Sequence, residues 1–242
     1  ALAADSPLPI HGLRGYELPA GGGPDDVVVT VSCSGSTEET LSIADQAQAR
    51  GIRWAAIAAP ESTLAGRAAQ AGVPFISVPN PGRAPRASLW SLAIPAIGVA
   101  EVVGAGLSLA DSPRWAAAVE AEDAVSGPDS ATASNPAKQL AAALADGLPM
   151  VWGTSPLMAV AAYRFMAQLA DNADQPAAHG ELPEANHNQV VTFDGTSAQA
   201  KSLALYLVRD RDEHPQVARR AEVSAQIAAD RGLRVTTVEG DG

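Results

Sequence analysis

The first half of the chain alternates short apolar runs with segments whose apolar residues recur at helical spacing. Residues 27–31 read Val-Val-Val-Thr-Val, an unbroken β-branched run that predicts a strand buried on both faces of a parallel sheet. Residues 38–50 place two acids in a first turn and apolar side chains on one side, which predicts a helix. The order of strand, polar loop and helix is typical of parallel α/β sheets.

This alternation continues to residue 109. We expect strands at 53–58 and 75–78, and a helix at 62–71 that ends at Gly72. Residues 79–85 contain three prolines and predict a loop. Residues 87–109 predict one long, mostly apolar helix that tolerates Pro95 as a kink and belongs to the core.

The pattern then repeats after a segment of small polar residues and prolines at 126–136, which is typical of a linker. We therefore expect a first subdomain at 1–126, a linker at 127–136 and a second subdomain at 137–242. The second subdomain is expected to contain helices at 137–145, 157–169 and 214–230, and strands at 149–152, 203–208 and 233–238. The fold class predicted is α/β, with two doubly wound parallel-sheet subdomains.

Composition limits the functions that the chain can have. Sixteen basic residues against 27 acidic ones give a net charge of −11, which opposes binding to nucleic acid or to an anionic membrane. An anionic ligand must therefore be bound by a local arrangement of donors. Alanine is abundant and arginine far outnumbers lysine. This compositional bias is typical of high-GC bacterial genomes and agrees with an actinobacterial-type protein.

Targeting and metal signals are weak. No segment approaches the ~18 to 20 consecutive apolar residues of a membrane span, and the N-terminus lacks a basic segment followed by an apolar one. The single cysteine, Cys33, excludes an internal disulfide and suits a reducing compartment, so we expect a soluble, cytoplasmic protein. No pair of the four histidines has the spacing of metal ligands, so we predict no metal, and we separately expect no cofactor.

The loop after the first predicted strand is the first candidate site. It carries four hydroxyls and one glycine: Ser32, Ser34, Gly35, Ser36 and Thr37. The free N–H groups and positive dipole end of the following helix favour an anion, and a glycine lets the backbone approach it. A phosphate would fit there without a lysine. The alternative is an ordinary helix cap with spare serines.

Residues 31–41 resemble the S-Y-S-G-N-T-E-E-T-L segment of the bifunctional phosphoglucose/phosphomannose isomerases, a family with the sugar-isomerase (SIS) fold. Residues 14–19, 85–89, 163–172 and 181–188 resemble further segments of the family, and the Pro-Glu-x-Asn-His-Asn block in the last is the most specific. The resemblance implies that this loop binds the phosphate of a hexose 6-phosphate, with Ser32, Ser34 and Thr37 in that role. Cys33 and Ser36 depart from the family's Tyr and Asn.

The resemblance also implies three catalytic residues. Asp171 aligns with the glutamate base that moves a proton between C1 and C2, His187 with the histidine that opens the sugar ring, and Arg86 with the arginine that stabilises the enediolate. By the same resemblance, the protein is a homodimer in which His187 reaches the partner's active site. Arg86 could instead be a surface arginine, His187 a turn histidine and Asp171 a residue of a helix end, while Glu184 ranks behind Asp171 as a base.

Two departures from the family keep a second function open. Asp171 is one methylene shorter than the family's glutamate, and the chain lacks the family's N-terminal strand with its Gly-Met-Gly-Gly-Ser loop and its C-terminal lysine segment, so we expect a fragment. The favoured function is interconversion of glucose 6-phosphate or mannose 6-phosphate with fructose 6-phosphate. The alternative is a non-catalytic sugar-phosphate sensor. A nucleotide-binding protein ranks far lower, because both common glycine-rich phosphate-loop motifs are absent.

Overall fold

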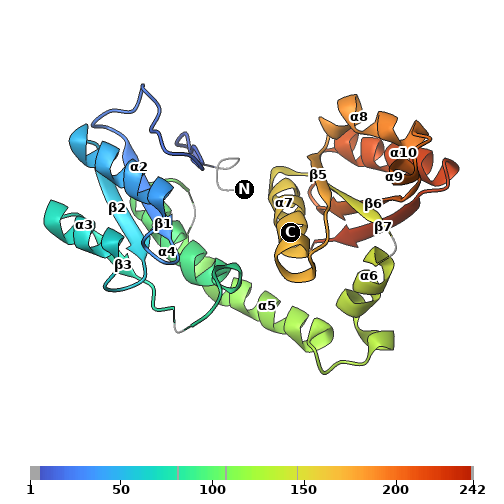
Figure 1. The fold of residues 1–242 in the computed structure, drawn as a ribbon, viewed down its shortest axis with the longest axis horizontal. Coiled ribbons are helices and arrows are strands. Elements are labelled where there is room, and N and C mark those ends of the chain that lie inside the picture. The colour runs from blue at the N-terminus through green and yellow to red at the C-terminus, as the bar shows by residue number, and fades with distance from the viewer. Residues whose placement is uncertain (1–5, 81, 107, 146, 241–242) are drawn as a thin grey trace. The chain divides into compact units, whose positions relative to one another are not determined.

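The computed structural model describes residues 6–80, 82–106, 108–145 and 147–240. Its contacts divide the chain into two compact units, here called the first unit, up to Trp115, and the second unit, from Ala116 onward (Figure 1). The division falls within helix α5 (Ser112–Ser126), an element that the sequence pattern did not predict. The predicted subdomain limits at 126 and 137 stay a prediction.

The first unit contains a three-stranded parallel sheet in the order β1-β2-β3. Its elements are β1 (Val27–Ser32), α2 (Glu38–Ala49), β2 (Arg53–Ala58), α3 (Thr63–Ala71), β3 (Phe75–Ser77), η1 (Pro85–Ala87), α4 (Leu89–Val102) and η2 (Leu109–Asp111). Helices α2 and α3 cover one face of the sheet, where their alanines and Leu64 pack against alternate residues of β2 such as Trp54. Helix α4 contacts β1 and β2. The predicted strands and first two helices are confirmed.

Strand β1 is less buried than its β-branched sequence predicts. It has one strand neighbour in the described sheet, β2, so it is the edge strand. Only Thr30 and Ser32 are buried, and Val31 is 37% exposed. The prediction of a strand buried on both faces is therefore wrong for β1 and fits β2, where five of the six residues are buried. A run of valines reports strand propensity but does not say where in the sheet the strand lies.

Helix α4 differs from the prediction in length and in burial. It ends at Val102, well short of residue 109, because Gly104 and Gly106 adopt positive φ angles of 81° and 88° that a right-handed helix cannot continue through. None of its residues is buried, so the prediction of a core helix is also wrong. Residue 107, inside the predicted helix, and residue 81, inside the predicted loop, lie outside the described residues.

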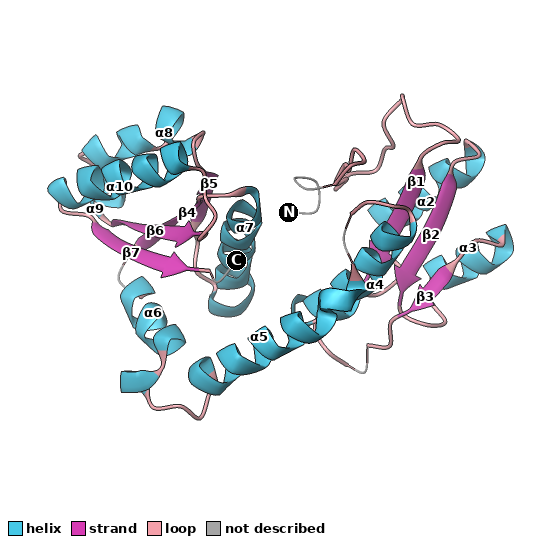
Figure 2. Cartoon of the chain, turned by 180° about the vertical axis from the view of Figure 1, so that it is seen from behind, coloured by secondary structure: helices cyan, strands magenta, loops and turns pink. Residues whose placement is uncertain are grey.

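The second unit contains a four-stranded parallel sheet in the order β5-β4-β6-β7. Its elements after α5 are η3 (Thr132–Ser134), α6 (Pro136–Leu144), β4 (Leu148–Gly153), α7 (Pro156–Ala173), β5 (Ala178–Glu181), α8 (Ala185–Asn188), η4 (Val190–Asp194), α9 (Ala198–Lys201), β6 (Leu203–Arg209), α10 (Pro215–Asp230) and β7 (Arg234–Glu239). Every strand and helix predicted for this half is present. The α/β class with two parallel sheets is therefore confirmed (Figure 2).

The two faces of the second sheet carry different helices. Val151 of β4 packs with Leu144 of α6 and with Leu169 of α7. The next residue, Trp152, points to the opposite face, because side chains alternate along a strand. It packs there with Ala185 of α8 and with residues of α10. Helices α7 and α8 therefore cover opposite faces of this sheet. No helix within the described ranges is both long and apolar enough to span a bilayer.

Candidate functional site

The hydroxyl loop connects β1 to α2 at the carboxyl edge of the first sheet, and Gly35 determines its shape. Gly35 has a φ of 67°, a conformation that favours glycine. A Cβ at this position would overlap the Ser62 side chain, which caps α3. The Gly35 carbonyl accepts a hydrogen bond from Leu64 N at 2.9 Å. The loop is thus packed against the start of α3 and requires glycine at its centre.

The hydroxyls of the loop bond to one another and to loop amides. Ser32 Oγ lies 2.8 Å from Thr37 Oγ1 and accepts a hydrogen bond from Gly35 N at 3.0 Å. Ser34 Oγ accepts from Ser36 N at 3.2 Å. Ser32 is buried, whereas Ser34, Ser36 and Thr37 are exposed. The loop therefore presents three hydroxyls to solvent from a base that Ser32 holds in place.

The start of α2 has no side-chain cap. Thr37 is the N-cap residue in an extended conformation, and its hydroxyl accepts no hydrogen bond from the first turn. The first intrahelical bond runs from Leu41 N to the Thr37 carbonyl at 3.0 Å. The amides of the first turn and the helix dipole are then available to an anion. Glu38 and Glu39 in the same turn make the surroundings negative, so an anion must bind through the amides and hydroxyls themselves.

Arg86 lies in the first unit, as the loop does. It belongs to η1, at the end of the segment that leaves β3 at the same sheet edge as the loop. Its residue is exposed, and its side chain is engaged in an interaction within the chain. The structure therefore places Arg86 on a connection adjoining the hydroxyl loop.

Asp171 and His187 lie in the second unit, on elements that cover opposite faces of its sheet. Asp171 is in α7 and His187 is in α8, and both are exposed. Gln175 Nε2, just after α7, donates to the Gly147 carbonyl at 3.2 Å, so this end of α7 lies at the edge where β4 begins. The fold of the second unit does not bring Asp171 and His187 together.

The Pro-Glu-x-Asn-His-Asn block forms a short, anchored turn that presents His187 outward. Asn186 Nδ2 donates to Ser224 Oγ of α10 at 2.6 Å, which attaches α8 to α10. Asn188 Nδ2 donates to Glu184 Oε1 at 3.0 Å. Glu184 therefore already serves the turn, in agreement with its low rank as a base. The neighbours of His187 are used for structure, whereas its own ring is exposed.

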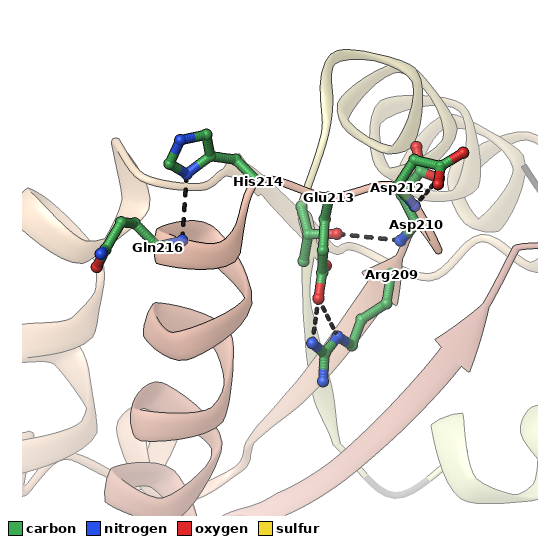
Figure 3. A network of polar contacts seen from close by, with 7 residues as sticks. Arg209, Asp210, Asp212, Glu213, His214 and Gln216 are labelled. Atoms are coloured by element: carbon green, nitrogen blue, oxygen red, sulfur yellow. Dashed lines mark hydrogen bonds and ion pairs between the residues drawn. The ribbon is translucent and has the colours of Figure 1, made fainter.

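A second hydroxyl loop, residues 153–155, joins β4 to α7, and here the helix start is occupied from within. Ser155 Oγ accepts a hydrogen bond from Met158 N at 3.2 Å and donates to Asp210 Oδ2 at 2.6 Å. Asp210 N donates to Thr154 Oγ1 at 3.2 Å (Figure 3). Asp210 follows β6, the neighbour of β4 in the sheet. Its carboxylate is an internal anion at the start of α7.

The segment that carries Asp210 is held by an ion pair between Arg209 and Glu213, drawn in Figure 3. The Glu213 side chain is 6% exposed, and Arg209 Nε donates to its Oε1 at 2.9 Å. Burial alone would raise the pKa of Glu213, but hydrogen bonds from Arg209 and Thr154 outweigh it, so the pKa is lowered. The carboxylate is therefore ionised at neutral pH. Among the described residues no group of three or more His, Cys, Asp and Glu side chains could hold a metal ion.

Asn80 is a polar residue of the first unit that the sequence reasoning missed. It lies three residues after β3, and its Nδ2 donates to Cys33 Sγ at 3.0 Å. Cys33 is the second residue of the hydroxyl loop. No sequence motif marks Asn80. The one signal available was its place in a loop after a strand of the same sheet, where side chains of parallel strands converge.

Comparison with known proteins shows which families the chain resembles. A model of the bacterial phosphoglucose isomerase C-terminal SIS domain matches residues 133–242. The bifunctional phosphoglucose/phosphomannose isomerase of Caldicellulosiruptor bescii is 30% identical over 228 residues, which cover 91% of this chain and 65% of the relative. The enzyme of the same name from Aquifex aeolicus is 29% identical over 236 residues, which cover 97% of this chain and 68% of the relative.

Over most of its length this chain is similar to the bifunctional phosphoglucose/phosphomannose isomerases, and residues 133–242 match the SIS-domain model. It spans about two thirds of the length of the curated relatives it matches. Solved structures with the same fold include the C-terminal domain of glucosamine-fructose-6-phosphate aminotransferase from Francisella tularensis (TM-score 0.61, 16% identity, 88% of this chain and 58% of that one). Tagatose-6-phosphate ketose/aldose isomerase from Escherichia coli is another (TM-score 0.57, 14% identity, 89% and 57%). The chain therefore shares the fold of these proteins.

Proposed function

We propose that this protein is a phosphosugar isomerase that interconverts glucose 6-phosphate or mannose 6-phosphate with fructose 6-phosphate. The observation that carries the proposal is the similarity to bifunctional phosphoglucose/phosphomannose isomerases over 91% and 97% of the chain. The chain shares its fold with a glucosamine-fructose-6-phosphate aminotransferase domain and a tagatose-6-phosphate isomerase, which supports a sugar phosphate as the substrate. No observation favours the non-catalytic sensor.

The hydroxyl loop is proposed to bind the substrate phosphate. In this proposal the exposed hydroxyls of Ser34, Ser36 and Thr37 and the uncapped amides of α2 donate to the phosphate oxygens, while Ser32 and Gly35 maintain the shape of the loop. The binding needs no lysine, which suits a chain with a net charge of −11. The local field of the helix start decides the interaction, not the net charge.

The chemistry is proton transfer through an enediolate. Asp171 removes the proton from C2 of the open-chain aldose, the electrons form the enediolate, and the proton returns to C1 to give the ketose. Arg86 stabilises the negative oxygen of the intermediate, and His187 moves the proton that opens the ring. The carboxyl of Asp171 retracts by about one bond length relative to glutamate, so turnover below that of a glutamate enzyme is expected.

The site is proposed to be completed in a homodimer. Within the second unit, His187 and Asp171 lie on elements that cover opposite faces of the sheet, and the His187 residue is exposed. A histidine presented in this way can serve the active site of a second copy, while Asp171 serves its own. A cytoplasmic location fits a substrate of central sugar metabolism and a lone cysteine.

The test is turnover of glucose 6-phosphate and of mannose 6-phosphate in heavy water. Transfer through an enediolate lets the moving hydrogen exchange with solvent, so we expect deuterium in the product. Asp171→Asn should abolish turnover, and Asp171→Glu should retain or raise it. Asp174→Asn, at the C-cap of the same helix, is the matched control and should leave turnover unchanged.

Each result has a clear reading. Absence of turnover in both the natural protein and Asp171→Glu would contradict the proposed reaction. Turnover that survives Asp171→Asn would remove Asp171 from the base position. Mixing an inactive His187→Ala protein with an inactive Asp171→Asn protein should restore part of the activity if the histidine acts across subunits, and should restore none if both residues serve the same chain.

A further inference from the structure

Two segments of the first unit meet at the carboxyl edge of its sheet through Asn80 and Cys33. The residues are 47 positions apart in the sequence, and Asn80 Nδ2 donates to Cys33 Sγ at 3.0 Å. A thiol is a weak hydrogen-bond acceptor. Cys33 stands between Ser32, whose hydroxyl supports the loop, and Ser34, whose hydroxyl is presented to solvent. The contact therefore acts on the first part of the hydroxyl loop, at Cys33.

The oxygen of the Asn80 side-chain amide makes no hydrogen bond to the described residues. This Oδ1 atom is buried. An unpaired buried acceptor lowers the stability of a fold, and such groups are rare in native structures. Asn186 Oδ1 is buried and unpaired in the same way, so this atom alone does not define the role of Asn80. What distinguishes Asn80 is its donation to Cys33 in the hydroxyl loop.

The backbone around Asn80 is fixed on both sides. Val78 N donates to the Ala58 carbonyl at 2.8 Å, which continues the strand pairing to within two residues of Asn80. Gly82 N donates to the Asn80 carbonyl at 2.7 Å in a turn where Gly82 has a φ of 74°. Arg86 follows four residues after Gly82. Asn80 is therefore a defined point on the connection that leads from β3 to Arg86.

We propose that Asn80 is a positioning residue: through Cys33 it holds the phosphate-binding loop against the connection that carries Arg86. This proposal rests on the proposed function. It adds Asn80 as the residue that sets the spacing between the hydroxyl loop and the connection that carries Arg86. Asn80 need not touch the substrate. Its removal is expected to let Cys33 and the loop move, which weakens the hold on the phosphate group.

The test uses two measurements on Asn80→Ala, with Gln70→Ala as the matched control. Gln70 is an exposed amide side chain on α3 in the same unit. The first measurement is the rate at which iodoacetamide alkylates Cys33, the chain's single cysteine, in the absence of ligand. We expect a rise of at least about threefold in Asn80→Ala, because a thiol that loses its partner becomes more accessible, and no change in Gln70→Ala.

The second measurement is the Kd of inorganic phosphate in the natural protein, in Asn80→Ala, in Cys33→Ala and in the double variant. We expect Asn80→Ala to weaken binding about tenfold, less than the about 10²-fold that a 1 Å displacement of a catalytic group can cost. In the Cys33→Ala background the same substitution should change the Kd less than about twofold, because the residue acts through Cys33. A purely structural role would give equal losses in both backgrounds.

The outcomes separate this proposal from the proposed function. Equal losses in the two backgrounds, or an unchanged Kd in Asn80→Ala, would overturn the role of Asn80 while leaving the isomerase proposal in place. A natural protein that does not bind phosphate would contradict the phosphate loop itself. The alkylation rates then still decide, because an unchanged rate in Asn80→Ala overturns the positioning role without any ligand.

Discussion

The two hydroxyl loops of this chain follow the same local design and differ in what fills the helix start. Each loop leaves a parallel strand, contains a glycine and hydroxyl residues, and leads into a helix. In the first loop, Thr37 makes no side-chain cap to α2, and three hydroxyl residues are exposed. In the second loop, Ser155 caps α7 and also donates to the Asp210 carboxylate. One helix start is open to an external anion, whereas the other holds an internal one.

This difference shows that a strand-loop-helix pattern predicts an anion site only in part. The loop supplies amides and hydroxyls, but the neighbouring strand decides whether an acidic side chain reaches them. Asp210 reaches Ser155 across 55 positions of sequence because β4 and β6 are adjacent in the sheet. In the first sheet, Ser62 at the start of α3 packs against Gly35 of the loop and brings no charge.

The largest effect is expected for Gly35→Ala. The new Cβ would occupy a left-handed conformation and overlap Ser62, so we expect a loss of about 2 to 4 kcal/mol in the free energy of unfolding together with loss of phosphate binding. Urea unfolding and phosphate titration measure the two effects. Combining the substitution with Ser62→Gly should restore part of the stability. Normal phosphate binding in Gly35→Ala would show that the first loop is not the anion site, and would contradict the proposed difference between the two loops.

A smaller loss is expected for Glu213→Gln, which tests the support of the second loop. The substitution leaves Arg209 with a neutral partner at a side chain that is 6% exposed, so we expect a loss of about 1.5 kcal/mol, the lower end for a hydrogen bond to a charged group. Phosphate binding should be unchanged. Weaker phosphate binding would contradict the separation of the two loops.

The same variant has a defined pH dependence. The folded-state pKa of Glu213 is lowered, so its contribution to stability is fully present above the unfolded pKa of about 4.3 and is lost as the pH falls through the folded value. The stability difference between the natural protein and Glu213→Gln should therefore be constant from pH 7 to pH 5. It should decrease at lower pH. Urea unfolding across this range checks the sign.

The smallest effects come from a matched pair, Ser155→Ala and Thr37→Ala. Ser155→Ala removes a cap and should cost about 1 kcal/mol of stability with no effect on phosphate binding. Thr37→Ala removes a hydroxyl that makes no cap bond but lies 2.8 Å from Ser32 Oγ, so it should also cost about 1 kcal/mol of stability, and in contrast to Ser155→Ala it should weaken phosphate binding. The reverse pattern would mean that the roles of the two loops are exchanged.

Local signals in the sequence predicted most of the elements. Ser62 and Gly72 bound α3 as a side-chain cap and a left-handed terminus, which are the roles that their residue types favour. The same logic overestimated α4, because the pattern of apolar residues continued past two glycines that end the helix. The partial exposure of β1 was not predicted, since the sequence of a strand does not show which strands lie next to it in the sheet.

The sequence suggested individual candidate residues, but not how those residues are arranged in space. The resemblance suggested the loop, Arg86, Asp171 and His187 as site residues, which stays a prediction, and it did not show that the last two lie on elements covering opposite faces of one sheet. The contacts of Asn80 and Asp210 join positions 47 and 55 residues away. Such pairings depend on which strands are adjacent, and a single sequence does not contain that information.

Binding of a sugar phosphate at the open start of α2 is tested by titrating the natural protein with glucose 6-phosphate and following the backbone amide signals in NMR spectra. We expect the amide signals of residues 34–40 to shift as the ligand binds, and those of Thr154, Ser155, Leu157 and Met158 to stay unchanged. Shifts at the second loop with none at residues 34–40 would show that the ligand does not bind at α2.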